Sequence, residues 1–280
     1  MTKVKIVTDS TADLSEDLVK ELGISVVPLS ITIDGETYLD RVDITQQEFL
    51  KKMKQSAELP KSSQPAVGHF VELFDRLGSD GSEVISIHMT GGMSGTVASA
   101  ENAARLSESD VTVIDSMYIS RALGFQVVEA AKMANAGQSK EEILKRVREI
   151  RDNSTLFVTV DTLENLVKGG RIGRGKALIG SLLNIKPIAS LQDGVYTPVS
   201  KVRSHAQIVK YLSKKFAEDV SNKTIKGVAI AQVDAMELAT NLKAAIKKLT
   251  GYEAVDIVET TPVISTHTGP GAIGFMYYAE

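Results

Sequence analysis

Strand-like and helix-like segments alternate along this chain, and this alternation restricts its fold more than any other feature of the sequence. Short β-branched runs, such as Val4–Thr8 and Glu83–His88, are each followed by a segment with helical periodicity. Amphipathic helices and short apolar strands bury their side chains best when they pack in layers. The pattern therefore predicts an α/β fold whose first half is a doubly wound, mostly parallel sheet.

The predicted elements cover most of the 280 residues. The predicted strands are Val4–Thr8, Ser25–Ile33, Glu83–His88, Val111–Asp115, Thr155–Val160, Lys186–Leu191, Val195–Val202, Gly227–Val233, Ala254–Glu259, Val263–Thr266 and Ala272–Tyr277. The predicted helices are Glu16–Leu22, Gln46–Gln55, Val67–Leu77, Thr96–Ser107, Ser120–Ala136, Lys140–Arg151, Leu163–Lys168, Lys176–Asn184, His205–Glu218 and Ala235–Leu249. Capping boxes at Thr45 with Glu48, and at Ser139 with Glu142, support two of the helix starts.

The second half of the chain departs from simple alternation. Asp193-Gly194 separates two strand-like runs, and this dipeptide favours a tight hairpin turn. Antiparallel pairing at that point predicts a mixed sheet. We therefore expect two domains, an N-terminal α/β domain over residues 1–160 and a C-terminal mixed α/β domain over residues 161–280.

Composition argues against several classes of function. The formal net charge is −3, which gives no indication of nucleic-acid binding. The chain has no cysteine, which excludes disulfides, thiolate catalysis and cysteine metal sites. No segment approaches the roughly 20 apolar residues of a membrane span, and the first residues include no apolar stretch of signal-peptide length. We therefore expect a soluble, cytoplasmic protein.

A glycine- and hydroxyl-rich segment, Met89–Thr96, lies between a predicted strand and a predicted helix. Free backbone N–H groups, the helix dipole and hydroxyls such as that of Ser94 make this turn a candidate anion site. The segment has no lysine, so it suits a carboxylate or a carbonyl-like oxygen better than the phosphates of a Walker-type loop. A simple helix cap explains the same residues equally well.

Short polar side chains also follow other predicted strands, at Asp9, Asp115 and Asp161. Ligands of open α/β sheets bind at the carboxyl ends of the strands, which makes this edge the candidate site. The alternative is that these residues serve only as helix caps. Ser62-Ser63-Gln64-Pro65 reads as a loop that brings a second set of hydroxyl donors toward residues 89–96, or as another capping turn.

Two nucleotide-binding patterns are incomplete. Gly269–Gly274 spells G-x-G-x-x-G, but too few residues follow it for the required helix and second strand. Gly170–Lys176 matches G-x-x-x-x-G-K, but Ala177 stands where a magnesium-binding hydroxyl is needed. The stiff turn after His267 favours a fixed, functional imidazole, with a structural histidine as the alternative. The four histidines lack metal-ligand spacing.

Taken in order along the chain, several segments resemble the DegV family of bacterial fatty-acid-binding proteins. The matching segments are Thr8–Leu14, Ser62–Pro65, Ser94–Thr96, Asp115-Ser116, Glu164–Ile172, Lys186–Ile188 and His267–Gly271. The family commonly has threonine where this chain has Ser62, and the substitution keeps the hydroxyl.

The resemblance implies a two-domain α/β protein with a long-chain fatty acid buried between the domains, and no other cofactor. The residues that it places at the fatty-acid carboxylate are Ser62, Ser94, Gly95, Arg171 and His267. Characterised members are acyl-presenting subunits of a fatty acid kinase. The resemblance therefore implies a separate ATP-binding kinase that phosphorylates the bound carboxylate for phospholipid synthesis, and no catalytic residue in this chain.

We expect that kinase to dock on the basic residues Arg174, Lys176, Lys201 and Arg203, whose alternative is a solvated surface. Two other functions stay open at this point. One is a small-molecule kinase or phosphosugar-handling α/β enzyme, and the other is a regulatory interaction protein with an incidental lipid. The incomplete nucleotide patterns favour the carrier over the enzyme.

Overall fold

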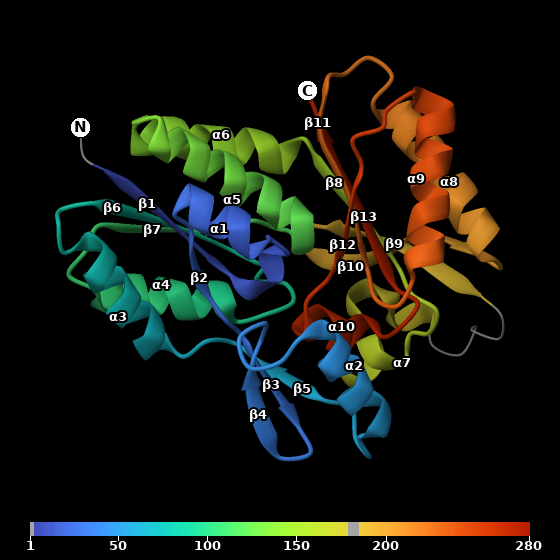
Figure 1. The fold of residues 1–280 in the computed structure, drawn as a ribbon, viewed down its shortest axis with the longest axis horizontal. Helices are drawn as coiled ribbons and strands as arrows, with labels where there is room; N and C mark the ends of the chain where they lie inside the picture. Colours follow the sequence, from blue (N-terminus) through green and yellow to red (C-terminus); the bar gives the residue numbers. More distant parts are fainter. Residues whose placement is uncertain (1–2, 179–184) are drawn as a thin grey trace.

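The computed structural model describes residues 3–178 and 185–280, and within them the strands form three β-sheets (Figure 1). The first sheet is entirely parallel, as its alternation with helices requires. Its strands, in spatial order, are β2 (Ser25–Val27), β1 (Val4–Asp9), β6 (Glu83–His88) and β7 (Val111–Asp115). The predicted doubly wound first half is therefore confirmed.

The second sheet is mixed, as expected from the hairpin signal. In spatial order its strands are β10 (Val195–Val202), β9 (Lys186–Gln192), β8 (Ser154–Thr159), β13 (Ile273–Ala279), β11 (Ile225–Gln232) and β12 (Asp256–Glu259). Only β11 and β12 pair in parallel. Asp193 and Gly194 both adopt positive φ angles, 52° and 72°, as the tight turn between β9 and β10 requires.

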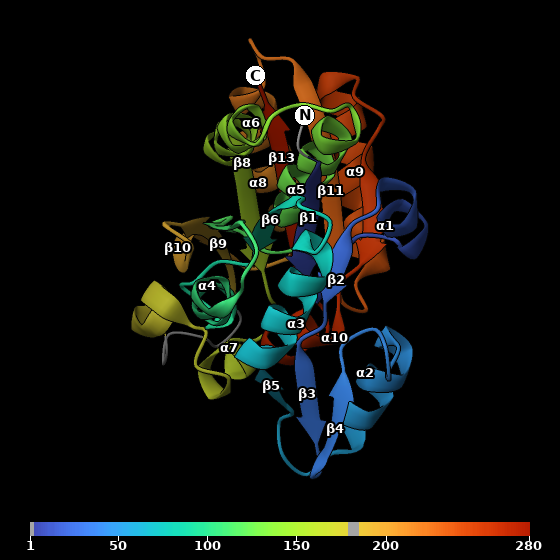
Figure 2. The same ribbon diagram turned by 90° about the vertical axis from the view of Figure 1, so that its left-hand side faces the viewer.

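A small antiparallel sheet, which the sequence did not predict, projects from one end of the molecule beside α2 (Figure 2). Its strands, in order, are β4 (Glu36–Leu39), β3 (Ser30–Ile33) and β5 (Lys61–Ser63). The predicted strand Ser25–Ile33 is split between this sheet and the first, because Pro28 has no N–H for a ladder and Leu29 donates its N–H to the Ser10 hydroxyl.

Helices cover the sheets. They are α1 (Glu16–Leu22), α2 (Gln46–Gln55), α3 (Val67–Gly78), α4 (Thr96–Leu106), α5 (Ser120–Asn135), α6 (Lys140–Asp152), α7 (Glu164–Lys168), α8 (His205–Asp219), α9 (Met236–Thr250) and α10 (Pro262–Thr268), with 3₁₀ turns η1 (Ser10–Ala12) and η2 (Gly173–Leu178). Both predicted capping boxes form. No helix of the described ranges is long and apolar enough to cross a membrane.

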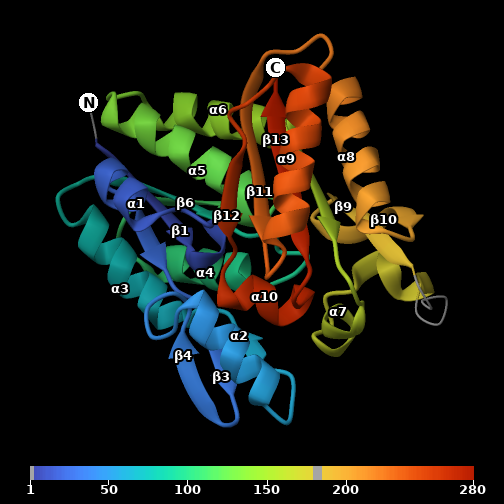
Figure 3. The same cartoon turned by 45° about the vertical axis from the view of Figure 1, so that its right-hand side comes forward.

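Helix α5 lies between the two large sheets. Its buried side chains share one core cluster with strands of both sheets, β1 and β8 among them. On the opposite face of the first sheet, α3 and α4 cover a second cluster. On the outer face of the second sheet, α8 and α9 lie side by side and cover a third (Figure 3). The two halves of the chain are thus joined by a continuous apolar core.

Two predicted elements need correction. The predicted strand Val263–Thr266 lies in α10, where Thr261 caps the first turn and Pro262 occupies its start. The predicted helix Lys176–Asn184 begins inside η2, and residues 179–184 lie outside the described ranges. The division into domains at residue 160 stays a prediction, and β8, which precedes it, pairs with β9 and β13 of the second sheet.

Candidate functional site

A cavity of about 310 Å³ lies where the small sheet, α10 and the segment after β6 meet. Its lining residues are Leu29, Ser62, Ser63, Gln64, Met89, Met93, Ser94, Ile119, Val158, Leu166, Arg171, Tyr196, Val263, Ile264, His267 and Thr268. Residues from both halves of the chain contribute, and the walls are mostly apolar. The carboxyl edge of the first sheet reaches this cavity through the segment after β6.

Polar and apolar lining residues occupy different ends of the cavity. Ser62, Arg171 and His267 also line a surface depression next to α7, so the polar end faces the outside. Val158 and Ile264 also line a smaller apolar cavity of about 20 Å³ toward β11 and β13, so the apolar end faces the interior. The site therefore suits a molecule with a polar head near the surface and an apolar tail inside.

Ser62 and His267 meet at the polar end. Ser62 lies on β5, paired with Ile31, and not in the loop that the sequence predicted. His267 lies in the last turn of α10, and not on the glycine-rich turn that follows. The Ser62 Oγ and His267 Nε2 atoms are 2.7 Å apart, within hydrogen-bond distance. This contact, and not the Gly-Pro-Gly turn, holds the imidazole in place.

His267 is neutral at physiological pH. Burial, and to a smaller extent the positive charge of Arg171, lower the pKa of the imidazole to about 4. The buried Nδ1 atom has no hydrogen-bond partner among the described residues. Gly169 lies against that atom so closely that a Cβ on Gly169 would come within 2.2 Å of Nδ1. The ring is therefore fixed on one edge by Ser62 and on the other by the backbone of α7.

Arg171 connects the two halves of the chain. Its Nε donates to the carbonyl of Met93 at 3.0 Å, and its Nη1 donates to the carbonyl of Gly169 at 2.7 Å. Neither bond is to a carboxylate, and within the described ranges Arg171 forms no ion pair. A guanidinium that lines an apolar cavity with its charge uncompensated is a strong attractor for an anion.

The segment after β6 supplies Ser94. Its Oγ lies 2.8 Å from the Thr96 hydroxyl and accepts the Thr96 N–H at 3.3 Å, at the start of α4. Gly95 caps α4 and does not line the cavity, but a Cβ there would come within 2.0 Å of Gln64 Oε1. Glycine at 95 therefore lets Gln64 pack over the turn, where its Nε2 donates to Ser99 at 2.8 Å.

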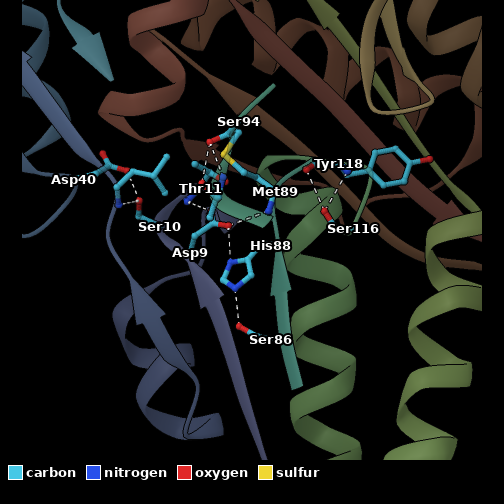
Figure 4. Close-up of polar contacts among 12 residues, drawn as sticks. Asp9, Ser10, Thr11, Asp40, Ser86, His88, Met89, Ser94, Ser116 and Tyr118 are labelled. Carbon is cyan, nitrogen blue, oxygen red and sulfur yellow. Dashed lines mark hydrogen bonds and ion pairs between the residues drawn. The ribbon is translucent and has the colours of Figure 1, made fainter. Parts of the chain in front are cut away.

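The other polar residues at the carboxyl edge bond to one another and do not line this cavity (Figure 4). Asp9 accepts hydrogen bonds from the Thr11 N–H and hydroxyl, from the Met89 N–H at 2.9 Å and from His88 Nδ1 at 3.0 Å. Burial alone would raise the pKa of Asp9, but these donors hold it below its ordinary value. Asp9 thus caps η1, as the alternative reading predicted, whereas Asp161 pairs with Lys186 and His205.

The incomplete nucleotide patterns also have structural explanations. Gly170–Lys176 follows a helix and enters η2, without the strand that a phosphate loop requires. Gly269 ends α10 with a φ of 72°, and Gly271 turns the chain into β13 with a φ of 83°. No three potential metal ligands lie together within the part of the chain that the structure describes.

The basic residues expected to bind a partner lie apart from the cavity. Arg174 and Lys176 are exposed on η2, and Arg174 pairs with Asp193 at 3.1 Å. Lys201 and Arg203 are exposed at the far end of β10, the edge strand of the second sheet. Because η2 packs against β10, all four basic residues lie on or beside that strand.

Sequence reasoning missed several residues that shape the site. Gln64 and Gly169 lie in segments that resemble the DegV family, but nothing local to them in the sequence indicates a role. Asp13 and Asp40, which hold α10, gave no local signal, because their partners lie more than 200 residues away. The structure does bring Ser62, Ser94, Arg171 and His267 to one cavity.

Comparison with known proteins places these features in a family. The model of a family described as "uncharacterised protein, DegV family" matches residues 3–280. A DegV domain-containing protein of Staphylococcus aureus is 44% identical over 276 residues, which cover 99% of each chain. A Thermus thermophilus structure described by its fatty acid binding is 33% identical, with a TM-score of 0.92 and complete coverage of both chains. The structure of a Bacillus subtilis DegV, described as a fatty acid binding protein, is 31% identical, with a TM-score of 0.91 and complete coverage of both chains. The chain therefore belongs to the DegV family.

Proposed function

We propose that the protein binds one long-chain fatty acid, with the carboxylate at the polar end of the cavity and the acyl chain in its apolar interior. One observation carries the proposal: a single cavity combines apolar walls with hydroxyl donors and an uncompensated arginine at its surface end. Relatives described as fatty acid binding share the fold over the whole chain, which supports the same ligand class here.

The head-group chemistry follows from the neutral imidazole. A neutral histidine carries one N–H, and Nδ1 has no partner in the described part of the chain. The proton is therefore best placed on Nε2, where it donates to Ser62 Oγ. The Ser62 hydrogen is then free to donate to a carboxylate oxygen, with the Ser94 hydroxyl as a second donor. Arg171 supplies the positive charge without which a carboxylate in this site would protonate or stay in water.

The tail gains its binding energy from burial. Each buried methylene contributes about 0.8 kcal/mol, so a chain of about 16 carbons supplies roughly 10 kcal/mol before ordering costs. The main cavity and the small cavity share Val158 and Ile264, which extends the apolar path toward the second sheet. Ligand binding therefore depends on both halves of the chain.

Presentation of the fatty acid to a separate ATP-dependent kinase is part of this proposal. The polar end of the cavity lies beside a surface depression, where a second protein can reach the carboxylate. The exposed basic residues along β10, Arg174, Lys176, Lys201 and Arg203, are the proposed docking surface. In this role the chain itself performs no chemistry, and the partner kinase forms the acyl phosphate on the fatty acid that the chain holds.

The first experiment identifies the ligand. Purified protein is denatured and its extract is analysed by mass spectrometry. A stoichiometric fatty acid supports the proposal, whereas a nucleotide or sugar phosphate supports the enzyme alternative and contradicts it.

The second experiment tests the head-group site by isothermal titration of delipidated protein with a long-chain fatty acid. A hydrogen bond to a charged group contributes about 1.5–3 kcal/mol, so Ser94→Ala and Ser62→Ala should each weaken binding about tenfold or more. The double variant should be less than additive, because both hydroxyls contact one group. Ser79→Ala, an exposed serine outside the cavity, is the control. Wild-type affinity in the double variant would place the carboxylate elsewhere.

A further inference from the structure

Two buried carboxylates of the first half hold the start of α10. Asp13 accepts the Thr260 hydroxyl at 2.8 Å and the Thr261 N–H at 3.1 Å, and it also bonds to the Ser120 hydroxyl. Asp40 accepts the N–H of Val263 at 3.3 Å. These contacts join residues 13 and 40 to a helix at the opposite end of the sequence.

Asp40 is itself fixed from the first sheet. The Ser10 hydroxyl donates to Asp40 Oδ2 at 2.6 Å (Figure 4) and accepts the N–H of Leu29 at 3.2 Å. Leu29 lines the ligand cavity, and so does Val263. The carboxylate therefore lies between two walls of the cavity and connects both to the end of β1.

Helix α10 links the two carboxylates to the head-group site. Its residues Val263, Ile264, His267 and Thr268 all line the cavity. Farther along the helix, Gln46 donates to the Ser265 hydroxyl at 2.7 Å and Asn165 donates to the carbonyl of Thr266 at 3.0 Å, and His267 meets Ser62. Because a helix of seven residues is a rigid element about 10 Å long, a displacement of its first turn also moves His267.

Burial of two carboxylates costs folding free energy, which argues that Asp13 and Asp40 do more than stabilise the fold. Asp13 is 4% exposed and Asp40 is 1% exposed. Burial raises the pKa of Asp13 to about 6 and that of Asp40 to about 7, and the two carboxylates repel each other. The charged groups that face them are Arg41, which favours both ionised forms, and Arg121, which favours that of Asp13. Apolar residues would hold the same helix at lower cost, but without fixing its position as narrowly.

We propose that Asp13 and Asp40 are positioning residues of the head-group site, which set the place of His267 by holding the first turn of α10. This inference rests on the proposed fatty-acid site for its functional meaning. Its structural part, the dependence of His267 on Asp40, can be measured without any ligand.

The experiment compares Asp40→Ala with Asp40→Asn. Asparagine keeps an oxygen for the N–H of Val263, whereas alanine does not. Side-chain NMR of delipidated protein reports the His267 pKa and the hydrogen bond at Nε2. In Asp40→Ala we expect the His267 pKa to rise toward its ordinary value and fatty-acid affinity to fall about tenfold. In Asp40→Asn we expect both to stay close to wild type. Asp13→Ala should behave like Asp40→Ala.

Ile246→Val controls for lost stability alone, because this fully buried side chain packs in the α8–α9 core and lines neither cavity. It should change neither readout. If Asp40→Ala does not fold, Asp40→Glu replaces it, since the longer side chain moves the carboxylate and should shift His267 in the same direction. An unchanged His267 signal in the folded variants overturns the proposal. Failure of wild-type protein to bind any fatty acid overturns the proposed function but leaves the His267 result standing.

Discussion

Gly169→Ala tests the head-group geometry with the smallest possible change. Gly169 ends α7 with an ordinary φ of −76°, so alanine causes no backbone strain there. The new methyl group, however, would lie 2.2 Å from His267 Nδ1 and 2.9 Å from His267 Cε1. The backbone carbonyl of Asn165, also 2.9 Å away, leaves the methyl group little room to retreat. The imidazole must therefore move.

The size of the effect follows from these distances. A comfortable contact between the new methyl group and Nδ1 needs about 3.5 Å. Because the unmoved ring would place Nδ1 at 2.2 Å, the imidazole must retreat by roughly 1.3 Å. The Ser62–His267 bond of 2.7 Å does not survive a shift of that size, because Ser62 blocks the ring on its opposite edge and the imidazole must turn out of line with the hydroxyl. Losing the hydrogen bond that orients the Ser62 hydroxyl toward a charged group costs about 1.5–3 kcal/mol, which is roughly a 10- to 150-fold loss of fatty-acid affinity.

Isothermal titration of the delipidated variant with a long-chain fatty acid measures this loss. Gly68→Ala is the matched control, because a Cβ at this position in α3 meets nothing within 4 Å. That control should bind like wild type and be more stable by up to about 1 kcal/mol, through helix propensity. Wild-type affinity in a folded Gly169→Ala variant would refute the reasoning, since His267 would then have no part in holding the head group.

Four further predictions concern pH, the tail, the partner and ATP turnover. The pKa of Asp40 is about 7 in the folded protein, against an ordinary value of 3.8, so the folded state gains a proton, and stability, as pH falls from 8 to 5. The melting temperature of wild type minus that of Asp40→Asn should therefore be larger at pH 5 than at pH 8. Val158→Phe fills the junction of the two cavities and should shift the bound fatty acids, measured by mass spectrometry, to shorter chains. Arg203→Glu should lower acyl phosphate formation with the kinase partner while fatty-acid affinity stays constant, and equal turnover would remove Arg203 from the docking surface. Without that partner, the purified chain should not turn over ATP, and turnover lost in Lys176→Ala would contradict the carrier proposal.

Much of the architecture could be read from local sequence. Strands β6 and β7 and helices α1 and α2 have the predicted bounds, because β-branched runs, helical periodicity and caps are properties of neighbouring residues. The hairpin at Asp193-Gly194 is equally local. The set of candidate site residues came from the family resemblance, because neither spacing nor periodicity predicts that these residues lie together.

Local patterns failed where long-range contacts decided the structure. Val263–Thr266 is β-branched enough to predict a strand, but its caps and the carboxylates of Asp13 and Asp40 make it helical. Ser62 lies on a strand of three residues that exists only because β3 lies beside it. A strand this short has no periodicity to detect.

The sequence by itself determined the α/β class, the parallel first sheet, most helix bounds and the set of polar residues available for a site. Only the tertiary structure decided that Ser62 and His267, 205 residues apart, lie 2.7 Å from each other, and that Arg171 lines the cavity with no anionic partner among the described residues. The physical reason is the range of the forces involved. Capping and periodicity act over one or two helical turns, whereas burial of an uncompensated charge and the lowered pKa of His267 depend on which distant surfaces exclude water together.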